Sequence, residues 1–359
     1  MSKPTRSLDV EIVDSDFHTT ESESDLYPYL EAPFDEMLQV DDSYFGQFYP
    51  SAGYVTPVDT GRAEMDKIRS ADDVRDAMEL LGTDASVITP GLNLRLGMVH
   101  HDDLAAAFAT AYNEWALDTI LDDVDDVYGT AVVAPQKPEK AVAEIERRAD
   151  ETSVVGVTIP SGGMTPPAGH ERYFPIYEAA ERAGLPVLLH NAGTGLMANF
   201  PHQWQWTNRY IDVHVPYHAA EHMFHLSTLL TNAVPVRYPD LEFVIQEAGV
   251  GWIPYFLHRY DNEYSEKRED ASMLEKTPSE YIRDQFYFTS QPLEGTEDPS
   301  YVCNMIRMFG GAESLMFSSD YPHFDFDFTD QLLQMLRREF STAEIENIYG
   351  ATAKAVYGI

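Results

Sequence analysis

The chain has 359 residues, of which 44% are hydrophobic, and its 60 acidic and 24 basic side chains give a formal net charge of −36. This charge argues against binding to nucleic acid or to an anionic membrane surface, because basic side chains supply most of the affinity for both. The single cysteine, Cys303, excludes an intramolecular disulfide, and no apolar run reaches the roughly 20 residues of a membrane helix, so we expect a cytoplasmic protein.

The first predicted element is a short apolar strand over residues 10–13, which is followed closely by Asp16 and His18. Residues 19–83 then form an acidic stretch that is rich in aromatic residues, prolines and glycines. It is too aromatic to be a disordered linker. We expect an irregular insertion that packs over one end of the domain, either as structural cover or as a lid over a bound substrate.

From residue 85 onward, predicted strands and helices alternate. Strands are expected at 85–89, 127–134, 153–159, 185–189, 241–245, 285–289 and 314–317. Helices are expected at 102–120, 138–149, 171–183, about 217–231, 252–264, 301–309 and 330–340, with a short helix at the C-terminus. Continuous apolar runs of this length are typical of buried parallel strands. With the first strand the count is eight, which predicts a (β/α)8 TIM barrel, an α/β fold, as a single domain over 1–359.

Side chains that bind metals follow four of these strands. Asp16 and His18 follow the first strand, His190 the fifth, Glu247 the sixth and Asp320 the eighth. Residues two apart in extended backbone point to the same side, so the first pair could reach one ion. Taken singly, a histidine here could be a hydrogen-bonded core residue and an aspartate a helix cap. Because the carboxyl ends of barrel strands share one mouth, their joint occurrence predicts a metal centre.

Other residues are candidates for substrate binding, each with a structural alternative. Arg95 could bind a carboxylate through its guanidinium, or form a surface ion pair. Residues 218–222, HAAEH, match the inverted signature of some zinc proteases. The alternating strand pattern is not typical of that protease class, so we expect His218 and His222 to line the substrate pocket, or to pack under the preceding loop. Trp204 in that loop could stack on a planar substrate or pack within the loop.

Several segments together resemble the amidohydrolase superfamily, and within it the group that includes aminocarboxymuconate-semialdehyde decarboxylase and the aromatic-acid decarboxylases. The resemblance covers nearly the whole chain. The most specific segment is the serine-aspartate-tyrosine-proline-histidine run at 319–323. The segments that carry the resemblance are 13–18 (VDSDFH), 111–115 (AYNEW), 185–190 (LPVLLH), 238–245 (YPDLEFVI), 315–323 (LMFSSDYPH) and 351–358 (ATAKAVYG).

The resemblance implies one divalent metal ion, zinc in the first place and manganese in the second. Its ligands would be Asp16, His18, His190 and Asp320. Asp16 stands where the family often has a histidine, and related decarboxylases place a glutamate there. The sixth strand of the family usually ends in a histidine that acts as acid or base. Glu247 takes that position here, either as a catalytic group, as a metal ligand or in a structural role.

Two reactions on a small-molecule substrate agree with the resemblance. In a hydrolase, Asp320 would take a proton from metal-bound water that attacks a C–N or C–O bond. In a non-oxidative decarboxylase, the metal would hold carboxylate or phenolate oxygens while an acid protonates the carbon. We favour the hydrolase, acting on a carboxylated or cyclic substrate, because the sixth-strand histidine is missing. Decarboxylation of an aromatic or unsaturated acid is the alternative, and a non-catalytic metabolite-binding barrel is the third hypothesis. The oligomeric state is open, and a homodimer is one option.

The negative charge further predicts an adaptation to high salt. Mutual repulsion among so many carboxylates destabilises a compact chain. At 1 M salt the Debye length falls to about 3 Å, which screens this repulsion. We therefore expect a halophilic protein, with an ordinary acidic enzyme as the alternative.

Overall fold

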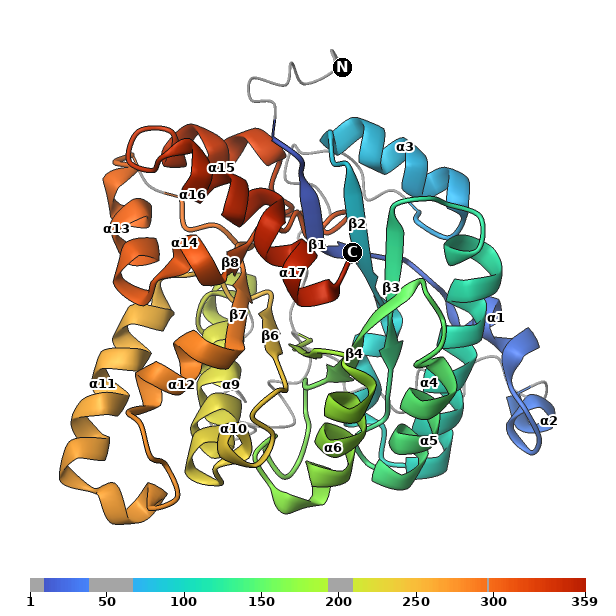
Figure 1. Ribbon diagram of the computed structural model, residues 1–359. Helices are drawn as coiled ribbons and strands as arrows, with labels where there is room; N and C mark the ends of the chain where they lie inside the picture. The colour runs from blue at the N-terminus through green and yellow to red at the C-terminus, as the bar shows by residue number, and fades with distance from the viewer. Residues whose placement is uncertain (1–9, 39–66, 193–208, 296) are drawn as a thin grey trace.

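The computed structural model describes residues 10–38, 67–192, 209–295 and 297–359, and its centre is a barrel of parallel strands (Figure 1). The eight strands pair in sequential order from β1 to β8. Two hydrogen bonds close the ring, from the Ser15 N–H to the Phe317 carbonyl and from the Asp320 N–H to the Asp16 carbonyl, each 2.9 Å. The predicted (β/α)8 barrel is confirmed. The strands are β1 (Val13–His18), β2 (Ala85–Thr89), β3 (Val127–Val132), β4 (Val154–Pro160), β5 (Val187–His190), β6 (Phe243–Gln246), β7 (Phe286–Thr289) and β8 (Leu315–Met316).

The helices surround the barrel (Figure 1). Their local signals are clear in α4, where Asp102 and Asp103 occupy the first turn and Leu104, Phe108 and Trp115 are buried on one face. None of the described helices is long and apolar enough to cross a membrane. The helices are α1 (Glu23–Leu26), α2 (Phe34–Leu38), α3 (Ala71–Leu81), α4 (Asp102–Ala116), α5 (Pro138–Arg148), α6 (Phe174–Ala183), α9 (Tyr210–Thr231), α10 (Val234–Arg237), α11 (Trp252–Glu266), α12 (Pro278–Gln285), α13 (Ser300–Phe309), α14 (Gly311–Ser314), α15 (Thr329–Leu336), α16 (Thr342–Glu346) and α17 (Thr352–Tyr357).

Alternation along each strand separates the barrel interior from the outer layer. In β5, Val187 and Leu189 pack in the large hydrophobic cluster, to which the surrounding helices contribute side chains. Leu188 belongs to a smaller hydrophobic cluster that is formed mainly by other strands. That smaller cluster also contains Val356 and Tyr357 of α17, which packs against β1 and β8. His190 lies two residues beyond Leu188, so its side chain points to the same, inner side of the barrel.

The structure corrects several expected elements. β1 spans Val13–His18 instead of 10–13, so Asp16 and His18 belong to the strand itself. The insertion at 19–83 is less irregular than expected, because α3 is a regular helix with the Ser70 side chain as its N-cap. The helix expected from about 217 begins at Tyr210 and contains Pro216. The helix α12 was not predicted. Residues 39–66 of the insertion lie outside the described residues.

Candidate metal centre

Asp16 and His18 face each other at the end of β1. The pairing of β1 with β2 shifts register between Asp14 and Phe17, so the ladder is irregular where the motif begins. Local disruptions such as β-bulges redirect side chains near active sites. Both side chains are fully buried, and His18 Nε2 lies 3.4 Å from Asp16 Oδ1. The two side chains therefore approach each other at one end of the strand.

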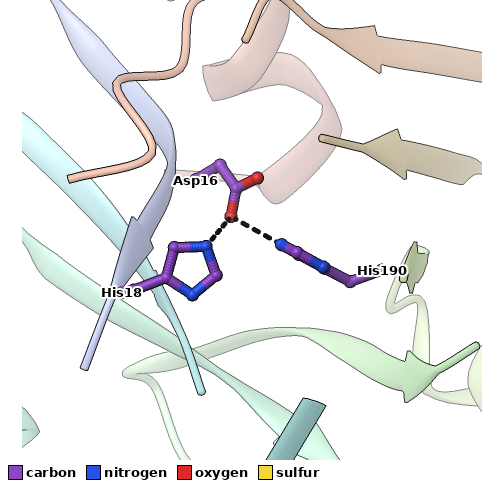
Figure 2. A group of neighbouring side chains, drawn as sticks. All are labelled: Asp16, His18 and His190. Atoms are coloured by element: carbon purple, nitrogen blue, oxygen red, sulfur yellow. Dashed lines mark ion pairs between the residues drawn. The ribbon is translucent and has the colours of Figure 1, made fainter. Parts of the chain in front are cut away.

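His190 approaches the same carboxylate from β5. Its Nε2 lies 3.3 Å from Asp16 Oδ1, so the oxygen stands between the two imidazoles (Figure 2). β1 and β5 thus bring together side chains that are far apart in the sequence. Burial opposes the charged form of His190, but the Asp16 carboxylate outweighs this effect and raises the pKa of His190.

Backbone carbonyls orient both imidazoles. His18 Nδ1 donates to the Pro90 carbonyl at 3.0 Å, and His190 Nδ1 donates to the Asn191 carbonyl at 2.7 Å. Because carbonyls only accept, the Nδ1 atoms carry ring protons, and the Nε2 atoms are left as the positions that would bind a metal ion. Burial lowers the pKa of His18, which keeps its ring neutral. Such partners on the outer nitrogen are what metal-binding histidines normally have.

Asp320, which follows β8 in the sequence, is the fourth side chain of the group. Its Oδ1 lies 2.9 Å from His18 Nε2 and accepts a hydrogen bond from His323 Nδ1 at 2.7 Å. Although burial opposes ionisation, His323 and His18 hold the pKa of Asp320 well below its usual range. Burial also acts against the charge of His323, yet Asp320 raises the pKa of His323 to about 9. At neutral pH the pair therefore carries a proton on His323.

The donor atoms of these four side chains fit a metal ion. Ligands about 2.1 Å from a tetrahedral zinc ion lie about 3.4 Å from one another. Here the separations are 2.9 Å from His18 to Asp320, 3.3 Å from His190 to Asp16 and 3.4 Å from His18 to Asp16. Four buried atoms have no hydrogen-bond partner among the described residues: Asp16 Oδ2, Asp320 Oδ2, His18 Nε2 and His190 Nε2. Buried polar atoms without partners are costly. With both imidazoles neutral, the two carboxylates would balance the charge of a divalent ion.

Glu247 follows β6 and lies on the far side of His190. Its Oε2 is 3.6 Å from His190 Nδ1, and its Oε1 is 3.7 Å from His218 Nδ1. Burial raises the pKa of Glu247 well above its usual value, and the charges of Asp320 and Asp16 add to the effect. Among the described residues, four non-glycine residues have positive φ, and Glu247 (54°) and Asp320 (60°) are two of them. Strained backbone of this kind is concentrated at functional sites.

The inverted protease motif does not form a metal site. His218 faces Glu247, whereas His222 Nε2 lies 2.8 Å from the Gln246 carbonyl. Glu221 instead accepts a hydrogen bond from the Gly163 N–H at 3.3 Å. Burial lowers the pKa of His222 to about 3, so this ring is neutral. His222 therefore ties α9 to the end of β6, while His218 faces Glu247.

The other two residues that we expected to bind substrate are Arg95 and Trp204. Arg95 is exposed on the short helix Leu92–Met98 after β2. Trp204 lies outside the described residues. The sequence analysis gave no role to His323, although this residue belongs to the most specific segment. It also gave none to His214, which lies one helical turn before His218. The i, i+4 spacing of the two histidines was the available signal for His214.

Comparison with known proteins identifies the class of protein. A family model described as amidohydrolase matches residues 62–359. The chain therefore belongs to the amidohydrolase family, a class of enzymes. The match begins after β1, so Asp16 and His18 lie outside it and their assignment depends on the geometry above. Comparison with curated proteins gave no match.

Solved structures share the fold over almost the full chain. An amidohydrolase from Mycobacterium avium subsp. paratuberculosis has 16% identity and a TM-score of 0.78, with 98% of this chain and 100% of that chain covered. The 5-carboxyvanillate decarboxylase of Novosphingobium aromaticivorans, complexed with manganese and 4-hydroxy-3-methoxy-5-nitrobenzoic acid, has 19% identity and a TM-score of 0.74, with 99% and 98% covered. A dihydroxybenzoic acid decarboxylase from Polaromonas, with manganese and 2-nitroresorcinol, has 17% identity and a TM-score of 0.66, with 97% of both chains covered.

Proposed function

We propose that this enzyme is a metal-dependent, non-oxidative decarboxylase of a small aromatic or unsaturated acid. The observation that carries the proposal is the convergence of Asp16, His18, His190 and Asp320, whose donor atoms lie at ligand spacing inside the barrel mouth. Manganese-containing decarboxylases of hydroxylated benzoates share the fold. This support favours decarboxylation over the hydrolysis that the sequence favoured.

The four side chains would hold one divalent ion, zinc or manganese. When bound, the ion would supply a Lewis acid for oxygens of the substrate. The chain supports its ligands from outside: Thr89 Oγ1 donates to Asp16 Oδ1 at 2.9 Å, and the carbonyls of Pro90 and Asn191 orient the imidazoles. Such outer contacts fix the ring orientation and raise the basicity of the ligands.

The proposed reaction also needs a proton donor. The bond between the substrate carbon and its carboxylate breaks, its electron pair stays on that carbon, carbon dioxide leaves, and the carbon takes up a proton. We assign the proton to the Asp320–His323 pair, because the 2.7 Å hydrogen bond connects His323 directly to the metal centre. The His323 side chain is 31% exposed, so it can regain a proton from solvent. General acids of this kind contribute about 10²–10⁴-fold to rate.

Hydrolysis is the second candidate, and one observation favours it. The low pKa of Asp320 keeps its carboxylate ionised, as a base that takes a proton from attacking water requires. In that reaction Asp320 would accept a proton, whereas in decarboxylation the Asp320–His323 pair gives one up. The two candidate reactions thus use the same residues for opposite proton transfers.

The test is product analysis with the metal-loaded enzyme. We expect carbon dioxide from a panel of hydroxylated benzoates and unsaturated acids, and neither ammonia nor a new acid from amides and lactones. His323→Gln should lower kcat by about 10²–10⁴-fold while the enzyme keeps its metal. The matched control is His258→Gln, an exposed histidine on α11. Release of ammonia or acid without carbon dioxide would refute decarboxylation.

A further inference from the structure

A second group of metal-binding side chains lies next to the centre described above. His214, His218 and Glu247 each offer one ligand atom, and these atoms lie within 4.8 Å of one another. The two histidines are one turn apart on α9, so they share a helix face. Glu247 reaches them from the end of β6, and its strained backbone conformation places its carboxyl group between α9 and His190.

The side chain of His218 gives independent evidence for a ligand at this position. It is only 6% exposed, and neither ring nitrogen has a hydrogen-bond partner among the described residues. A buried imidazole in a helix that served packing alone would normally find a partner for at least one nitrogen.

The charges of the site point in the same direction. Asp16, Asp320 and Glu247 are close enough to influence one another, and all three are buried. The first ion would use Asp16 and Asp320, so Glu247 remains as the carboxylate ligand of a second cation. The neighbouring imidazoles of His214 and His218 would supply lone pairs to that cation.

We propose that His214, His218 and Glu247 form a second divalent metal site, separated from the first by the His190 ring. The 3.7 Å between His218 Nδ1 and Glu247 Oε1 is close to the roughly 3.4 Å expected between two ligands of one zinc ion. Two imidazoles and one carboxylate form a set typical of zinc with an open fourth position. That open position would take water or an anionic oxygen of the substrate.

This second site goes beyond the proposed function and does not depend on it. It assigns Glu247 the role of a metal ligand, one of the three roles that the sequence left open. Asp325 Oδ2 lies 3.4 Å from His214 Nε2, so a carboxylate is also available to orient this histidine or to join the ligand set.

The experiment counts bound metal. The full-length protein is freed of metal with a chelator and dialysed to equilibrium against Zn²⁺, and metal is measured per chain. We expect about two equivalents for the wild type and for the control His258→Ala, and about one for His214→Ala, His218→Ala and Glu247→Gln. Asp16→Asn should also retain about one, because it removes only the first ion.

One equivalent in the wild type, or two equivalents in His214→Ala, would overturn the proposal. The side chain of His214 is 22% exposed, so its removal is the mildest of the three changes and decides the result if the buried variants fail to fold. Melting curves of the metal-free variants establish which of them fold. Absence of carbon dioxide release would refute the proposed reaction and leave the metal count unaffected, so the two failures are distinguishable.

Discussion

Replacement of His190 by alanine tests the first metal centre most directly. His190 comes from β5, opposite β1, and its Nε2 lies 3.3 Å from Asp16 Oδ1. The change removes one of four expected ligands without adding a charge. Loss even of an outer partner of a ligand typically lowers metal affinity 10- to 100-fold. We therefore expect the loss of a direct ligand to lower affinity by at least about 100-fold.

The expected size of the effect follows from mass action. An ion present at 100 times its dissociation constant stabilises the wild type by about 2.7 kcal/mol. For 359 residues, an unfolding entropy of about 2.1 cal/mol/K per residue gives roughly 0.75 kcal/mol/K. The melting temperature should rise by about 3–4 °C. At the same ion concentration, a variant with 100-fold weaker binding gains only about 0.4 kcal/mol, or roughly 0.5 °C.

The assay is scanning calorimetry of metal-free protein with and without added Mn²⁺. The quantity compared is the shift caused by the ion, so that a change in the stability of the metal-free variant does not enter. His258→Ala is the control and should keep the full shift. Repeating the titration in His218→Ala separates this ion from the second one proposed above. A full wild-type shift in His190→Ala in that background would refute the assignment of His190 as a ligand.

Two further predictions concern charge. Burial raises the pKa of Asp14 from 3.8 to about 7, so the folded state holds a proton that the unfolded state has lost. The free energy of unfolding should therefore fall by up to about 1.4 kcal/mol per pH unit as pH rises from about 4 to 7. In the presence of chelator, the free energy of unfolding should change less steeply with pH in Asp14→Asn than in the wild type. An unchanged pH dependence would contradict this. The net charge of −36 further predicts that the melting temperature rises between 0.1 and 2 M KCl, and a constant or falling value would count against a halophilic protein.

The barrel could be predicted because its signal is local. Strands such as Ala85–Thr89 are short apolar runs, and the spacing of apolar residues in Asp102–Ala116 marks a helix. Local rules failed where tertiary contacts overrule them. The predicted helix starts at about 217, just after Pro216, a residue that is unfavourable inside a helix, yet α9 begins at Tyr210. His214 was therefore placed in a loop and missed as a partner of His218.

The candidate site likewise has features that the sequence predicted and features that only tertiary contacts determine. The residue types after each strand, and their resemblance to a family, were enough to select Asp16, His18, His190 and Asp320. The role of Glu247 could not be read in this way, because it depends on which groups surround its carboxyl group. Only the folded structure places it between His190 and His218, on a residue with positive φ. The pairing of Asp320 with His323 is likewise a matter of rotamer and distance.

The sequence by itself thus determined the repeating strand–helix order, the excess of negative charge and the kinds of side chain at the strand ends, since these depend on local pattern and composition. The tertiary structure decided which nitrogen of each histidine faces the centre, which carboxylates share it and which buried atoms lack partners. These properties arise from contacts between residues up to about 300 positions apart, such as Asp16 and Asp320, which no local pattern encodes.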